Sequence, residues 1–161
     1  MLKKILKKFI LKQIIYNPKD VNSEYYIVKY SVPFINKFMC INVISNETDN
    51  MHSHNRSFIS IIIKGGYIEK FIKRGNVTGD VIVKKRTAGS IIYRHYSDFH
   101  QITPFAKTYT LFIYFRKISK GINWLVDGKV YSEARHWLKS GYSKEYMREL
   151  YKKQEPWNHL T

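Results

Sequence analysis

The hydrophobic positions between residues 24 and 118 fall in short runs that turn residues separate. The clearest runs are YYIVKY, FINKFMCINVI, ISIII, YIEKFI, DVIVKK, GSIIYR and TYTLFIYF. Short runs rich in β-branched and aromatic residues predict strands. Lys64-Gly65-Gly66 is expected to turn the chain between two of them, and Asp127-Gly128 predicts a later hairpin. About eight strands joined by short turns indicate an all-β barrel or sandwich.

Two end segments follow a helical period instead. From residue 2 to residue 15 hydrophobic side chains recur at three- and four-residue steps with lysines on the other side, and Pro18 ends the pattern. Near the other end, Ser143 is a good N-cap for a helical stretch over 143–153, before Pro156. We expect the first helix to pack on the barrel, or else to bind a membrane surface or a partner.

These patterns divide the chain of 161 residues into three parts. We predict an N-terminal helix appendage over 1–17, a barrel over 18–140, and a C-terminal helix and tail over 141–161. The length suits one domain. No stretch reaches the roughly 20 apolar residues that would span a bilayer, and the first residues make a poor secretory signal, so a cytoplasmic location is expected.

The chain is strongly basic: it has 28 Lys and Arg residues against 12 Asp and Glu, which gives a net charge of +16. Such a charge attracts polyanions, whether nucleic acid, an anionic membrane or an acidic protein. Without a recognised nucleic-acid motif we expect this binding to be weak and independent of sequence. Codon bias in an AT-rich genome is the alternative source of the lysines. The single cysteine, Cys40, excludes an intrachain disulfide and a cysteine-based zinc site.

The histidines are the candidate chemistry. His52 and His54 lie on the same face if their segment is a strand. His100 comes from a distant strand and would complete a metal site of three nitrogen ligands. The alternative is a site without metal, in which the histidines serve as hydrogen-bonding groups in a pocket.

The spacing of these histidines resembles two motifs of the cupin superfamily. The segment from His52 to Gly66 resembles the first motif, G-x5-H-x-H-x3or4-E-x6-G, and Gly89 and His100 are spaced as in the second, G-x5-P-x-G-x2-H-x3-N. Phe58 or Ile59 stands at the glutamate position. The segments GGYIEKF, AGSIIYR and TLFIYF look similar to a cupin group that is common in phage and bacterial genomes.

The resemblance implies an antiparallel cupin-type β-barrel, or jelly roll, with a metal held by His52, His54 and His100. Fe(II) is favoured as the cofactor, with Zn(II) or Ni(II) as alternatives, because the ligands are neutral nitrogens. The site resembles those of three-histidine cupins such as thiol dioxygenases. If the chain is phage-encoded, the cytoplasm is that of the host.

The pocket of such a barrel would hold a small anionic substrate. Arg56 and Ser60 share the alternation of His54 along the expected strand, and Tyr93 lies on another strand, so these three are the candidate substrate-binding residues. His95, at the proline position of the second motif, is a weaker candidate ligand.

Two functions from different classes follow. The first is a metal-binding cupin, an Fe(II) oxygenase-like enzyme acting on a small anion. The second is a non-enzymatic scaffold that binds nucleic acid or a phage or host protein through its basic surface. A sugar epimerase is a third, but it needs a His–Asp pair and a Tyr. Homodimerisation is expected by analogy with other cupins.

Overall fold

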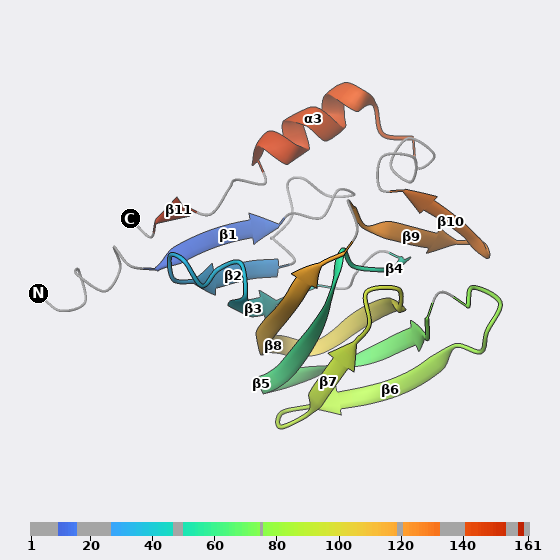
Figure 1. Ribbon diagram of the computed structural model, residues 1–161, viewed down its shortest axis with the longest axis horizontal. Coiled ribbons are helices and arrows are strands. Elements are labelled where there is room, and N and C mark those ends of the chain that lie inside the picture. Colours follow the sequence, from blue (N-terminus) through green and yellow to red (C-terminus); the bar gives the residue numbers. More distant parts are fainter. Residues whose placement is uncertain are drawn as a thin grey trace, which may run out of the picture.

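The computed structural model describes residues 10–15, 27–46, 50–74, 76–118, 121–132, 141–153 and 158–159. Within them lie eleven strands and a C-terminal helix (Figure 1). They are β1 (Leu11–Ile15), β2 (Ile27–Ser31), β3 (Met39–Ile44), β4 (Met51–His52), β5 (Arg56–Ile72), β6 (Ile82–Thr87), β7 (Ile91–Arg94), β8 (Phe99–Lys117), β9 (Asn123–Val126), β10 (Lys129–Ser132), α3 (Lys144–Lys153) and β11 (Asn158–His159). The all-β class and the C-terminal helix are confirmed.

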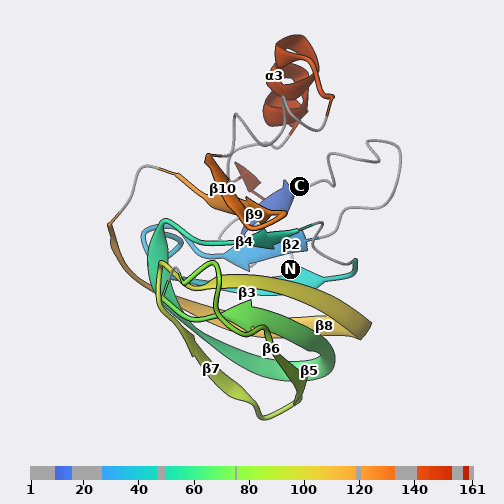
Figure 2. The same cartoon turned by 90° about the vertical axis from the view of Figure 1, so that its right-hand side faces the viewer.

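Two long strands organise the sheet. β5 has 17 residues and β8 has 19, and they pair antiparallel along almost their whole length. β3, β2, β1 and β11 extend the sheet from β8, whereas β6 and β7 pair with β5. In Figures 1 and 2, β6 and β7 lie at one end of the molecule and α3 lies at the other. The sheet is not closed into the barrel that the sequence analysis predicted.

The two glycines of β5 bend the strand and do not end it. The register of β5 against β8 shifts around Gly65 and Gly66, and Gly65 has a positive φ of 81°. A Cβ on Gly66 would clash with the carbonyl oxygen of Arg86 and with the ring of Phe105. The predicted turn is therefore a bulge, because glycine allows both the left-handed backbone and the close approach of neighbouring strands.

Residues 11–15 also differ from the prediction. They form β1 and not the end of an N-terminal helix, while residues 1–9 lie outside the described residues. β1 pairs with β2 on one side and with β11 on the other. Both of its edges thus gain backbone hydrogen bonds from strands far away in the sequence, and this tertiary pairing outweighs a local helical pattern.

The core lies between the inward faces of these strands, and its centre is a cluster of Ile44, Ile62, Tyr67, Ile92 and Ile102. The opposite face of β3, β8, β5 and β7 is also apolar. Cross-strand pairing builds two rows on it, which we call the outer apolar face: Ile41–Leu111–Ile61–Ile91 and Met39–Ile113–Ile59–Tyr93. Neither row contains a charged residue. In the part of the chain described, no helix is long and apolar enough to cross a membrane.

Candidate metal site and cavity

Three separate stretches of backbone supply the histidines of the predicted site. His52 lies in β4 and pairs directly with His100 at the start of β8. His54 lies in the link between β4 and β5, so the single strand predicted for His52 and His54 is interrupted. Backbone hydrogen bonds to distant segments hold this link, since the amide of Ser53 donates to the carbonyl of Asn123 and that of His54 to the carbonyl of Tyr96.

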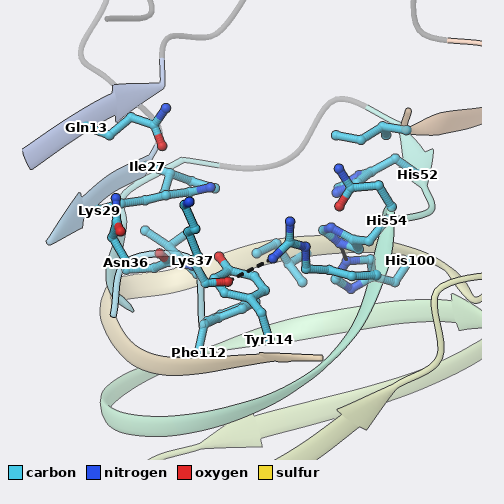
Figure 3. Close-up of a pocket in the computed structure, with 16 residues that line it drawn as sticks. Gln13, Ile27, Lys29, Asn36, Lys37, His52, His54, His100, Phe112 and Tyr114 are labelled. Atoms are coloured by element: carbon cyan, nitrogen blue, oxygen red, sulfur yellow. Dashed lines mark hydrogen bonds between the residues drawn. The ribbon is translucent and has the colours of Figure 1, made fainter. Parts of the chain in front are cut away.

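The histidine side chains nevertheless converge, as Figure 3 shows. One ligand atom from each of His52, His54 and His100 can be chosen so that all lie within 4.8 Å of one another. The Nε2 atoms of His54 and His100 are 2.8 Å apart. Nitrogens that share one ion at about 2.0–2.1 Å lie about 3–4 Å apart, so small side-chain rotations would seat a metal.

The protonation state also suits a metal. Burial lowers the pKa of His52 to about 3, and the neighbouring His100 acts in the same direction. Burial likewise holds the pKa of His54 well below its ordinary value. Both imidazoles are therefore neutral near pH 7, which is the form that binds metal ions.

A buried carboxylate behind His100 was not predicted from the sequence. Glu69, with 1% of its surface exposed, accepts hydrogen bonds from His100 Nδ1 at 3.3 Å and from Arg94 Nε at 2.8 Å on its Oε1. Its Oε2 accepts from Arg94 Nη2 and from Arg86 Nε. Because Nδ1 of His100 donates to the carboxylate, its Nε2 lone pair is directed toward His54. Carboxylates in this position orient metal-binding histidines in many proteins.

The same contacts keep Glu69 ionised. Burial by itself would raise the pKa of this carboxyl group, but hydrogen bonds from His100 and Arg94 outweigh it and lower the pKa to about 2. The sequence did carry a signal: Glu69 shares the face of Tyr67 and Phe71, so it is a carboxylate at a core-facing position of a strand.

A cavity of about 570 Å³ lies beside the histidines. Figure 3 shows His52, His54 and His100 at one end, with Gln13, Lys29, Asn36 and Lys37 at the other. The remaining lining residues are Ile27, Asn42, Ile44, Asn55, Arg56, Ile102, Phe112, Tyr114 and Ile122. No Asp or Glu of the described residues lines the cavity, so its charged side chains are all basic.

The candidate substrate-binding residues separate in the structure. Arg56 lines the cavity. Ser60 is buried and does not line it. Tyr93 lies on the outer apolar face, with 54% of its surface exposed and its ring edge-on to Phe115. His95 forms a hydrogen bond between its Nδ1 and Ser97 Oγ, at 2.8 Å, and is not part of the histidine cluster.

Lys29 is a cavity residue that the sequence analysis did not single out. It lies in β2, and its cross-strand partners Gln13 in β1 and Asn42 in β3 also line the cavity. The sequence signal was a lysine inside the apolar run YYIVKY. The alternation of that run places Lys29 on the inner face, but only the pairing with β1 and β3 shows what it faces.

No protein-family model matches this sequence, and no curated protein is similar to it. Solved structures do show similarity. One is the cupin domain of Drosophila melanogaster CENP-C, with 10% identity and a TM-score of 0.45 over 55% of this chain and 69% of that chain.

Two enzymes are also among the similar structures. One is an oxalate decarboxylase variant from B. subtilis, with 12% identity and a TM-score of 0.47 over 87% of this chain and 39% of that chain. The other is hydroxypropylphosphonic acid epoxidase from S. wedmorenis, with 12% identity and a TM-score of 0.42 over 64% and 59%.

Proposed function

We propose that this protein binds one divalent metal ion through His52, His54 and His100, next to a cavity for a small anionic ligand. The observation that carries the proposal is the convergence of the ligand atoms of these histidines within 4.8 Å. Fe(II) is the favoured ion, because the ligands are neutral imidazoles without a carboxylate; Zn(II) and Ni(II) are the alternatives.

Three protein ligands leave coordination positions open toward the cavity. Fe(II) in such a site would supply oxygen chemistry, so the reaction class we propose is oxygenase-like, in a protein of the cytoplasm. The residues of this chain would orient the substrate and limit water. Arg56 would hold an anionic group, Phe112 and Ile102 would shield part of the cavity, and Glu69 would fix the ring of His100.

Metal analysis of the full chain, purified without a histidine tag under anaerobic conditions, tests this proposal. We expect about one ion per chain and a sharp loss of occupancy in His54→Ala, since two imidazoles seldom retain a labile metal. His95→Ala is the matched control and should keep its metal, because His95 lies outside the cluster. The proposal is refuted if the native protein carries no stoichiometric metal and if none of Fe(II), Zn(II) and Ni(II) binds to it when added.

The alternative function is a scaffold that binds polyanions through exposed basic side chains. Lys85 on β6 is exposed, as are Lys73 and Arg74 after β5. Such binding would be weak, independent of sequence and steeply dependent on salt. Fluorescence anisotropy with two unrelated oligonucleotides at about 50 and 200 mM salt measures it. Salt-independent, sequence-selective binding would place this function ahead of the first.

We also propose that two copies of the chain pair through the outer apolar face. On a chain of net charge +16, this face lets two copies meet without bringing cations together, because its two rows contain no charge. Exposed apolar patches of this kind mark interaction sites. Sedimentation should show a dimer that Ile91→Lys abolishes, whereas Val83→Lys on β6, at a similarly exposed valine, should leave it intact. A monomeric wild-type protein at high micromolar concentration would contradict this pairing.

A further inference from the structure

The cavity holds cations without an acidic partner among the described residues. Lys29 from β2 lies at the end away from the histidines (Figure 3), Arg56 from the start of β5 also lines the cavity, and both are half-buried. Neither makes an ion pair with a described residue, and no described carboxylate lines the cavity. Charged groups that lose water cost free energy unless an opposite charge offsets the loss, and no described residue supplies that charge to Lys29 or Arg56.

The two cations also act on each other. Burial lowers the pKa of Lys29, the nearby Cys40 raises it in part, and the positive charge of Arg56 lowers it. A bound anion would oppose the effects of burial and of Arg56, because it supplies an opposite charge to Lys29 and Arg56 together.

Arg56 is held in place for such a contact. Its Nη1 donates to the carbonyl oxygen of Lys37 at 2.9 Å, and its guanidinium lies over the ring of Tyr114, 5.4 Å from the ring centroid. These contacts use only part of its five N–H donors. A guanidinium that is already oriented loses less side-chain entropy when it binds a carboxylate or a phosphate through two parallel hydrogen bonds.

We propose that Lys29 and Arg56 form an oxyanion-binding subsite for one end of a small organic acid or phosphate. The volume of about 570 Å³ limits the ligand to a small molecule. The proposal deepens the proposed function, on which it rests for the second half of the ligand: the opposite end of the same molecule would lie at the histidine cluster. The anion subsite itself needs no metal.

The experiment therefore uses the metal-free full chain. Succinate and inorganic phosphate are titrated separately by calorimetry at low ionic strength, and the stronger binder shows which oxyanion the subsite prefers. We expect Arg56→Gln and Lys29→Gln each to weaken binding about ten- to hundredfold, the usual effect of losing a hydrogen bond to a charged group. Lys84→Gln, on exposed β6, is the matched control and should bind like the wild type.

His54→Ala separates this proposal from the metal proposal. This variant should lose the metal but keep its affinity for the anion, because the subsite uses the side chains of Lys29 and Arg56 and Figure 3 places His54 at the opposite end of the cavity from Lys29. If Lys29→Gln does not fold, as judged by circular dichroism, Arg56→Lys replaces it; this variant retains the charge and should lose less affinity than Arg56→Gln. The proposal is overturned if neither anion binds, or if Lys84→Gln weakens binding as much as Arg56→Gln does.

Discussion

Two groups of charged side chains in this structure differ in whether opposite charges accompany them. Around Glu69, a single buried carboxylate is surrounded by Arg94, Arg86 and His100, each of which donates to it. Lys29 and Arg56 both line the cavity and have no acidic partner among the described residues. The first group combines both signs of charge, whereas the described part of the second contains cations alone.

Under the proposed function, the first group positions the site and the second group binds the ligand. Burying charges costs several kcal/mol per ion unless they are paired and hydrogen-bonded, and the Glu69 group meets both conditions. Arg56 is held by the carbonyl oxygen of Lys37 and the ring of Tyr114, but no described carboxylate neutralises Lys29 or Arg56. Two like charges beside converging histidines support the proposal, since perturbed groups cluster at functional sites.

The largest effect on stability is expected from a substitution in the Glu69 group. Glu69→Gln leaves the buried Arg94 without its carboxylate, and we expect the free energy of unfolding to fall by about 3–5 kcal/mol. Urea denaturation followed by circular dichroism measures it. Glu145→Gln, at an exposed position in the first turn of α3, should change stability by no more than about 0.5 kcal/mol. Equal effects for the two variants would show that Glu69 is not the centre of a buried charge network.

Removing a charge from the Lys29 and Arg56 group should not lower the stability of the fold. Lys29→Gln removes one of two like charges, so we expect the free energy of unfolding of the ligand-free protein to stay constant or rise, by at most about 1 kcal/mol. The same urea experiment applies, with Lys84→Gln as the exposed control. A loss of about 3 kcal/mol or more would mean that Lys29 has a partner in the fold, and the comparison between the two groups would fail.

The smallest effect concerns Cys40, which lies close to both Lys29 and Tyr114. Burial raises the pKa of the Cys40 thiol, although the positive charge of Lys29 acts in the opposite direction. Fewer thiolates exist at a given pH when the pKa is raised, so native Cys40 should react with iodoacetamide at least about tenfold more slowly than in urea at pH 8. The alkylation rate of native Cys40 should still increase with pH above the pH at which a free thiol is fully ionised.

Lys29→Gln sharpens this measurement. Removing the cation should raise the pKa of Cys40 further and slow its alkylation, whereas Lys84→Gln should have no effect. Faster alkylation in Lys29→Gln would show that the side chain of Lys29 shields the thiol physically, and that its charge is the weaker influence. The conclusion that burial dominates at Cys40 would then need to be revised.

The local sequence determined much of the fold. Runs of β-branched and aromatic residues became strands, Ser143 preceded a helix at Lys144–Lys153, and Asp127-Gly128 formed the hairpin between β9 and β10 with φ values of 50° and 70°. The histidine trio could also be named, because His52, His54 and His100 match the spacing of the two motifs, and their side chains do converge although His54 lies outside a strand. Each of these features depends on chemistry within a few residues or on a known spacing.

Tertiary structure alone decided the rest. Residues 11–15 became a strand because β2 and β11 supply hydrogen bonds to both edges, and Gly65-Gly66 became a bulge because β8 continues alongside it. Alternation in a strand assigns a side chain to a face but does not show what lies opposite. Glu69 reached His100, and Lys29 reached the cavity, only through pairing between strands that are distant in sequence. Long-range pairing therefore determined which charges pair within the fold and which line the cavity.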